Sequence, residues 1–346
     1  MYCFPGVFCR LQVATEATGF SQRARRRVQA MKILPQLVIG RLQPRYPLIQ
    51  GGMAIRVSTG RLAGSVAREG GIGLIAGSGM SAEELGHEMR VARGLAQGGI
   101  VGVNCLVAAS AFLEVMKAAI AAGADLLVAG AGFSRDLLQL GRQHGVPVVP
   151  IVCSTRLAKM AQDLGAAAVI VEGKEAGGHL GTTKSSRVLY PAIKEAVKIP
   201  VIIAGGVITR QDLIEVFTMG VDGVQVGTRF AASDESNVAP AFKERYLQAR
   251  EGDVVKIHSP VGLPGNALPT PFSGRLAAGA GKPASCNACL KRCSQSFCII
   301  RALTNAKDGN LEEGLVFAGE GVHKIDRIMS VKDIFTMYFE GLEPRH

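Results

Sequence analysis

The sequence contains no tryptophan and only 5% aromatic residues, and charged residues make up just 19% of its 346 positions. No apolar run approaches the roughly 18 residues that span a bilayer, so we expect a soluble protein without a membrane anchor. The hydrophobic content of 48% excludes a mainly disordered chain, because so much apolar material is enough for a core. The 43 glycines predict many tight turns and close packing of small residues.

Acidic residues are scarce near the N-terminus, where the basic excess is concentrated. Residues 1–30 hold five arginines against one acid, Glu16, and supply four units of the +11 formal charge. This segment lacks the apolar core of a secretory signal. We interpret it as a disordered leader or an upstream-start artefact, and an Arg-rich transit peptide is the alternative. Because basic and aromatic residues are not interleaved elsewhere, we expect no nucleic-acid partner.

Four of the eight cysteines, Cys286, Cys289, Cys293 and Cys298, form one tight run. Such a cluster in a chain without a secretory signal indicates a reducing compartment, here the cytoplasm. Four thiolates at this spacing can bind a [4Fe–4S] cluster or a tetrahedral zinc ion. Zinc usually takes two separated Cys-x₂-Cys pairs, so the three short gaps favour iron–sulfur. Four unligated thiols remain the third alternative.

A repeating pattern of short apolar runs and helical segments begins near residue 47. The runs are continuous in hydrophobicity, as expected of parallel strands that are buried on both faces. Eight such units in about 190 residues predict an α/β protein with a (β/α)₈ TIM barrel rather than an open, doubly wound sheet. The predicted strands are 47–50, 72–76, 101–106, 126–129, 146–152, 167–171, 200–204 and 223–226.

Glycine-rich turns follow the seventh and eighth predicted strands. Ala204-Gly205-Gly206 and Gly227-Thr228 occupy corresponding positions in consecutive βα units. Backbone N–H groups in two such turns can cradle a phosphate without a lysine. In TIM barrels phosphate sites commonly lie after these two strands, at the end of the barrel that carries the chemistry. We therefore expect a phosphate-bearing ligand here.

A histidine lies in a flexible segment after the sixth predicted strand, within Glu172-Gly-Lys-Glu-Ala-Gly-Gly-His179. This position is the C-terminal mouth of the barrel, and histidine can act near neutral pH as an acid, a base or a hydrogen-bond donor. His179 is therefore the candidate catalytic residue.

Five segments together resemble the nitronate monooxygenase family (2-nitropropane dioxygenases) and the related FMN-dependent enoyl-acyl-carrier-protein reductases. The resemblance covers roughly residues 35–340 and implies a TIM barrel that binds FMN non-covalently. It further implies that Gly52, Met53 and Asn104 face the isoalloxazine and that His179 is catalytic. By the same resemblance, Gly177 and Gly178 lie along the cofactor chain, and the phosphate is held by Gly205, Gly206, Gly227 and Thr228, with Ala204 also in the cofactor site. The segments are 50–53, 102–104, 175–179, 204–207 and 227–228.

The resemblance leaves two chemistries open. Oxidation of a nitronate needs electron transfer to FMN and then to oxygen, with His179 stabilising the nitro group or acting as a base. Reduction of an enoyl thioester takes hydride from NAD(P)H through FMN, with His179 stabilising the enolate. We place nitronate oxidation first, although an oxygen-labile cluster at the four cysteines would favour a reductase. A barrel with Cys153 as nucleophile is a weaker alternative, because that cysteine lacks Gly–Ser surroundings.

The composition divides the chain into three parts. Residues 1–30 form the leader, and 31–255 form the FMN-binding barrel. Residues 256–346 comprise a linker rich in Gly, Pro and Ala that acts as a lid, the four-cysteine module and C-terminal helices that pack on the barrel. We expect a small-molecule substrate, and a homodimer is the expected assembly.

Overall fold

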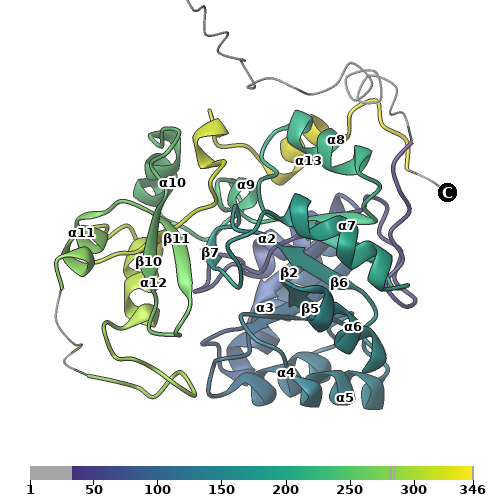
Figure 1. Cartoon of the computed structure of the whole chain (residues 1–346), viewed down its shortest axis with the longest axis horizontal. Coiled ribbons are helices and arrows are strands. Elements are labelled where there is room, and N and C mark those ends of the chain that lie inside the picture. The colour runs from purple at the N-terminus through teal and green to yellow at the C-terminus, as the bar shows by residue number, and fades with distance from the viewer. Residues whose placement is uncertain (1–32, 280–282, 284, 345–346) are drawn as a thin grey trace, which may run out of the picture.

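A computed structural model describes residues 33–279, 283 and 285–344 of the chain. The predicted leader, residues 1–30, lies outside the described residues. Eight parallel strands close into a barrel in the order β1-β2-β3-β4-β5-β6-β8-β9, and β9 pairs with β1. The predicted TIM barrel is therefore confirmed (Figure 1).

Each barrel strand corresponds to one of the eight predicted runs. β2 and β9 match their runs at both ends, and the ends of the other strands shift by at most two residues, as expected where a strand grades into a turn. The strands are β1 (Leu48–Gln50), β2 (Ile72–Ala76), β3 (Ile100–Leu106), β4 (Leu127–Gly130), β5 (Val148–Val152), β6 (Val169–Glu172), β8 (Val201–Ala204) and β9 (Gly223–Val226).

Helices cover the outside of the barrel. Several begin at a Ser or Thr whose side chain accepts the N–H three residues on, which satisfies an otherwise unpaired donor. The helices between strands are α2 (Gly60–Arg68), α3 (Ala82–Ala96), α4 (Phe112–Ala121), α5 (Arg135–His144), α6 (Thr155–Asp163), α7 (Ser186–Ala196) and α8 (Arg210–Thr218), and the short α9 (Thr228–Ala231) follows β9.

The barrel strands alternate between two buried environments. One set of side chains fills the barrel interior, and the other set packs against the helices. Both sets are apolar, which explains why the strands read as continuous hydrophobic runs. The interior set includes Ile49, Ile72, Leu74, Leu126, Val128, Val149, Ile170 and Ile202.

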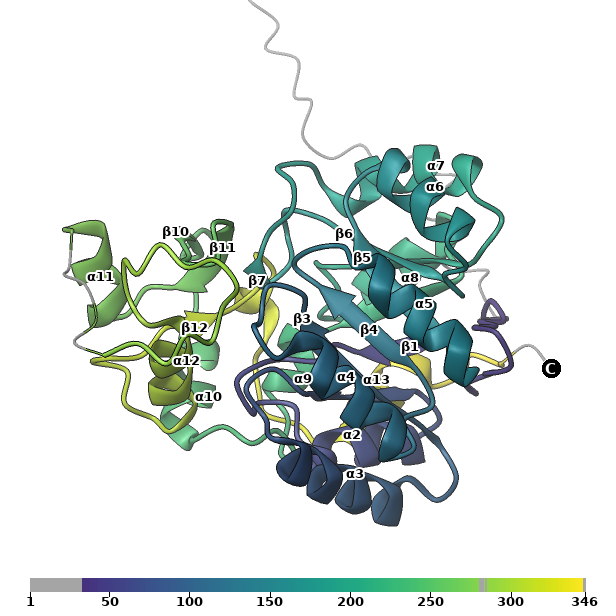
Figure 2. The same cartoon turned by 90° about the horizontal axis from the view of Figure 1, so that it is seen from below.

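A second lobe lies beside the mouth of the barrel (Figure 2). Its antiparallel sheet has the order β10-β11-β12, and β7 (Gly178–His179), from the loop after β6, pairs with β11. The remaining elements are α10 (Pro240–Leu247), β10 (Val255–His258), β11 (Pro264–Leu268), α11 (Pro271–Ala277), α12 (Ile299–Lys307), β12 (Val316–Phe317), the 3₁₀ helix η1 (Val322–Lys324) and α13 (Val331–Phe339).

The chain returns to the barrel at its C-terminal end, where α13 packs against α2 and α8. The segment expected to be a linker contains β11, the strand that pairs with both of its neighbours in the lobe's sheet and with β7. No helix in the described ranges is both long and apolar enough to cross a membrane.

The packing of α2 on β2 gives a first testable prediction. A Cβ added at Gly73 would lie 1.9 Å from the Ala63 carbonyl oxygen of α2, so Gly73→Ala should lower the free energy of unfolding by about 2–3 kcal/mol. As a matched control, exposed Gly94 in α3 has nothing within 4 Å of an added Cβ. Gly94→Ala should raise that free energy by about 0.5 kcal/mol. Urea unfolding of both variants measures the two changes, and equal stabilities would contradict the close packing.

Candidate active site

A cavity of about 420 Å³ lies between the C-terminal ends of the barrel strands and the second lobe. The structure brings all of the predicted cofactor-binding and catalytic residues together on its wall. Because these residues come from five separate segments of the chain, only the closed barrel makes them neighbours. They are Gly52, Met53, Asn104, Gly177, Gly178, His179, Ala204, Gly205, Gly206, Gly227 and Thr228.

The floor of the cavity is the last inward-facing layer of the barrel. Asn104 and Gln225 belong to this layer, and Asn104 Nδ2 donates to the Gly52 carbonyl at 2.9 Å. The oxygens Asn104 Oδ1 and Gln225 Oε1 are buried and have no hydrogen-bond partner in the described part of the chain. A buried acceptor without a partner is costly, so the floor is suited to a ligand with N–H or O–H donors.

The predicted phosphate turns lie on one side of the cavity. Gly205 and Gly206 have φ angles of +101° and +73°, which a side chain rarely adopts. Thr228 is the first residue of α9, and its Oγ1 accepts the Gly319 N–H at 3.0 Å. The Thr228 hydroxyl therefore keeps its own hydrogen for a ligand, and Gly319 completes the wall of the turn from the C-terminal segment.

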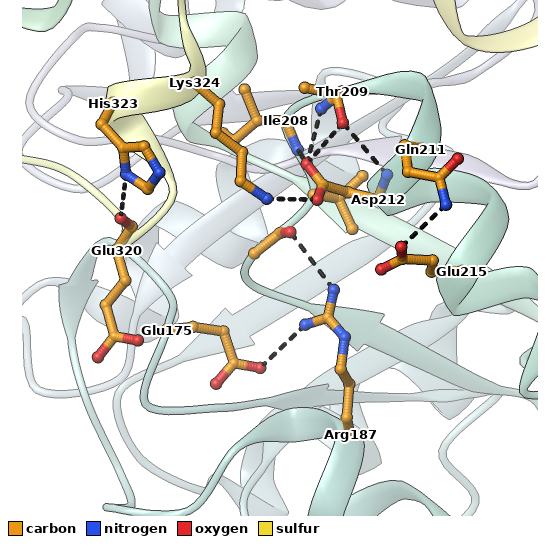
Figure 3. Close-up of polar contacts among 12 residues, drawn as sticks. Glu175, Arg187, Ile208, Thr209, Gln211, Asp212, Glu215, Glu320, His323 and Lys324 are labelled. Atoms are coloured by element: carbon orange, nitrogen blue, oxygen red, sulfur yellow. Dashed lines mark hydrogen bonds and ion pairs between the residues drawn. The ribbon is translucent and has the colours of Figure 1, made fainter. Parts of the chain in front are cut away.

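A carboxylate behind these turns ties them to the histidine loop. Glu175 Oε1 accepts the Ser186 N–H at 2.9 Å and forms an ion pair with Arg187 Nη1 at 3.7 Å. Arg187 Nη2 also donates to the Gly206 carbonyl at 3.4 Å. Figure 3 shows Arg187 extending from α7 toward Glu175. The loop after β6 and the turn after β8 are thus held by one network.

A second ion pair fixes the start of α8. Asp212 forms a capping box with Thr209 and accepts Lys324 Nζ at 2.6 Å, as Figure 3 also shows. Burial opposes ionisation of Asp212, but the hydrogen bonds from Lys324 and from the N–H groups of Thr209 and Ile208 lower its pKa. Lys324 belongs to η1, so this contact joins the C-terminal segment to the helix that follows the phosphate turn.

His179 is positioned by the second lobe. It pairs with Gly265 in the β7–β11 ladder, and its Nε2 lies 2.8 Å from Ser259 Oγ. The Phe317 ring meets the imidazole edge-on, with 5.2 Å between ring centroids. Burial lowers the pKa of His179 to about 4, so the imidazole is neutral at physiological pH.

The rest of the histidine loop is also held by the lobe. Asn266 Nδ2 donates to the carbonyls of Lys174 and Ala176 at 2.7 and 2.8 Å. Asn266 is only 1% exposed, and its amide satisfies two loop carbonyls that no strand could reach. A residue of β11 therefore sets the path of the loop that carries the histidine.

The wall that the lobe contributes is apolar. It lies opposite the polar floor and extends from His179 and Phe317 into the lobe's own core. Its other members are Val261, Leu290, Ile299, Ile300, Leu303 and Leu315. The cavity can therefore hold a ligand that is polar at one end and aliphatic at the other.

The sequence profile of the nitronate monooxygenase family matches residues 36–340. The chain belongs to the nitronate monooxygenase family. A probable nitronate monooxygenase of Bacillus subtilis is 27% identical over 216 residues, which are 58% of this chain and 59% of that protein. The family and its structural neighbours make this protein an oxidoreductase, as the sequence predicts.

Two further relatives have other names. The (3aS,4S,5R,7aS)-5-hydroxy-7a-methyl-1-oxo-octahydro-1H-indene-4-carboxyl-CoA dehydrogenase of Mycobacterium tuberculosis is 30% identical over 237 residues, 68% of this chain and 66% of that protein. FabK from Thermotoga maritima is 31% identical, with a TM-score of 0.77 over 86% of this chain and 93% of its own. The matches to the Bacillus subtilis and Mycobacterium tuberculosis proteins each span less than two thirds of that protein's length.

The prediction of a metal site at the four clustered cysteines is not supported by the structure. All four are described, yet no group of three or more His, Cys, Asp or Glu side chains in the described residues could hold a metal ion. Cys286 is exposed, and Cys289 and Cys293 pack against the apolar core of the lobe. Cys298 is the N-cap residue of α12. The thiols lie near one another without converging, so the structure does not support the expected [4Fe–4S] cluster or its zinc alternative.

Several residues in or next to the cavity could not be predicted from the sequence. Glu172 and Gln225 are single polar residues within apolar strands, and only the inward side of the barrel distinguishes them. Ser259 and Asn266 lie outside the barrel motifs, in the segment expected to be a lid. Their signal in the sequence is no stronger than that of any other loop residue.

Proposed function

We propose that the protein is an FMN-dependent oxidoreductase that reduces the C=C bond of an aliphatic α,β-unsaturated acyl thioester with electrons from NAD(P)H. The apolar wall of the cavity carries this proposal, because it offers far more aliphatic surface than a small nitronate needs. The similarity to FabK and to a CoA-thioester dehydrogenase supports it. The order of the two chemistries expected from the sequence is thereby reversed, and the cysteines no longer contribute to the argument.

The polar side of the cavity fits FMN. The unpartnered oxygens Asn104 Oδ1 and Gln225 Oε1 are free to accept hydrogen bonds from a flavin ring, which Gly52, Met53 and Asn104 would face. Gly177 and Gly178 would lie along the ribityl chain. The turns whose glycines have positive φ leave room for backbone N–H groups to hold the phosphate. The residues of this phosphate site would be Gly205, Gly206, Gly227 and Thr228, and Ala204 would line the cofactor site beside them.

The chain's own contribution to the reaction would come mainly from His179. FMN would supply the hydride that is added to the β-carbon of the enoyl thioester. As that carbon accepts hydride, negative charge develops on the thioester carbonyl oxygen, and the neutral imidazole would donate a hydrogen bond to it. The α-carbon then takes a proton from solvent. Ser259 would fix the ring, and the apolar wall would exclude water and so strengthen the hydrogen bond.

Nitronate oxidation is the second candidate, and membership of the family favours it. In this reaction His179 would stabilise the anionic nitro group or act as a base on a neutral nitroalkane. The same flavin site would serve both reactions, so only the apolar wall distinguishes them.

Two measurements on the purified full-length protein test the proposal. The visible spectrum should show flavin, and the released cofactor should be FMN; a protein that neither contains nor takes up FMN would contradict the cofactor. Under anaerobic conditions, NAD(P)H should be oxidised with trans-2-octenoyl thioester. Its kcat/KM should be at least about tenfold higher than with crotonyl thioester, because four more CH₂ groups are buried. Turnover with propionate-3-nitronate alone would favour the second candidate.

A further inference from the structure

Glu172 is an acidic residue on the floor of the cavity that none of the expected roles includes. It is the last residue of β6, and its side chain lies on the same side of the strand as Ala168 and Ile170, which fill the barrel interior. Glu172 accordingly lines the cavity. The carboxyl group therefore projects from the top of the barrel interior into the cavity.

The neighbours of Glu172 across the sheet define the shape of this part of the floor. Glu172 pairs with Ala204 in β8, and Ala204 pairs with Gln225 in β9. Adjacent strands are about 4.8 Å apart, so the Glu172 and Gln225 backbones are roughly 10 Å apart with a single methyl group between them. The acid and the amide thus flank the space above Ala204.

No hydrogen bond or ion pair within the described residues holds the Glu172 carboxyl group. Burial, with a smaller contribution from the charge of Glu175, raises its pKa to about 8. Arg187 forms an ion pair with Glu175, and no cation among the described residues contributes to the pKa of Glu172. Cys153 at the end of β5 is the other titratable group close to the carboxyl. The other titratable groups on the cavity wall are His179, Tyr246 and Cys289.

We propose that Glu172 is a flavin-binding residue, whose carboxylic acid donates a hydrogen bond to an acceptor atom of the flavin ring. Gln225 would hold the ring from the other side of Ala204 through its unpartnered oxygen. The inference rests on the proposed FMN site and adds to it a donor that must carry a proton. Ionised Glu172 would instead present two acceptor oxygens to the same atom and would repel it.

The expected consequence is proton-linked binding of the flavin. Below pH 8 Glu172 is neutral, and the dissociation constant should not depend on this group. As the pH rises above its pKa, flavin binding must first return a proton to the carboxylate, so the dissociation constant should rise about tenfold per pH unit.

The test titrates the full-length apoprotein with FMN, and separately with riboflavin, and follows quenching of flavin fluorescence from pH 6.5 to 9.5. The wild type should lose about tenfold in affinity between pH 8 and 9.5 for both flavins. Glu172→Gln keeps the shape and an N–H donor without a proton to lose, so its affinity should stay constant over this range. Glu195→Gln removes an exposed acid on α7 and should behave as the wild type.

A flat wild-type profile, or the same alkaline loss in Glu172→Gln, would overturn the inference. The wild-type profile decides the matter by itself should the variant fail to fold, which thermal unfolding would reveal. Absence of FMN binding at every pH would contradict the cofactor proposal instead. The two failures are therefore distinguishable.

Discussion

Replacement of His179 by alanine is expected to lower kcat by at least about 100-fold while FMN stays bound. The imidazole lines the cavity and is the hydrogen-bond donor that would stabilise charge on the substrate oxygen. The His179 side chain bonds to Ser259, and no hydrogen bond in the described residues joins it to the predicted phosphate turns, so cofactor affinity should change little. Steady-state kinetics with an enoyl thioester, together with the ratio of flavin to protein, measures both quantities.

Ser259→Ala is the matched variant for this experiment. It removes the partner of Nε2 without removing the imidazole, and one net hydrogen bond corresponds to a loss of about 2- to 10-fold. Because the pKa of His179 lies near 4, the histidine should produce no limb in the rate profile between pH 6 and 9. Full turnover by His179→Ala would exclude the residue from the mechanism.

Substitution of Gly205 by valine should weaken FMN binding by about 100-fold or more. The residue has a φ of +101°, and an added Cβ would lie 3.0 Å from the Ala176 nitrogen. A β-branched side chain would strain the backbone there and displace the turn that we propose holds the phosphate. Fluorescence titration with FMN measures the loss, which should be much smaller for riboflavin because riboflavin has no phosphate.

Gly252→Val provides the control for backbone strain alone. Gly252 also has a positive φ, +86°, but it precedes β10 on the surface, and nothing lies within 4 Å of an added Cβ. This variant should lose stability and keep wild-type affinity for FMN. Wild-type FMN affinity in Gly205→Val would contradict the phosphate site.

The barrel could be predicted because its strands are buried on both faces. Each therefore appears as an unbroken apolar run, and eight runs within one stretch of sequence leave few other folds. The strand ends could be predicted less well. The run 146–152 begins two residues before β5, because the Val146 N–H donates to the Gly141 carbonyl near the end of α5 instead of to a neighbouring strand. The hydrophobic pattern of the sequence does not reveal such local hydrogen bonds, so it cannot locate the first residue of the strand.

The candidate site was predictable where it depends on the backbone. Gly205 and Gly206 have positive φ angles, and a side chain at either position would be strained. Glu172 and Gln225 on the floor were not predictable, because an isolated acid or amide in a strand has the same appearance whether it faces a cavity or a helix, and Asn104 was expected there only from the family resemblance. The four cysteines illustrate the converse, since close spacing along the chain does not make thiols converge.

The β7–β11 ladder bears on how substrate can enter. The backbone of His179 is paired with β11 in the sheet of the second lobe. If the lobe moved away from the barrel, His179 would therefore move with it. Any displacement of the lobe would carry the imidazole, Ser259 and the apolar wall away from the floor of the cavity together. The movement that encloses the substrate would therefore also bring His179 into position. With the lobe displaced, we expect the enzyme to be inactive.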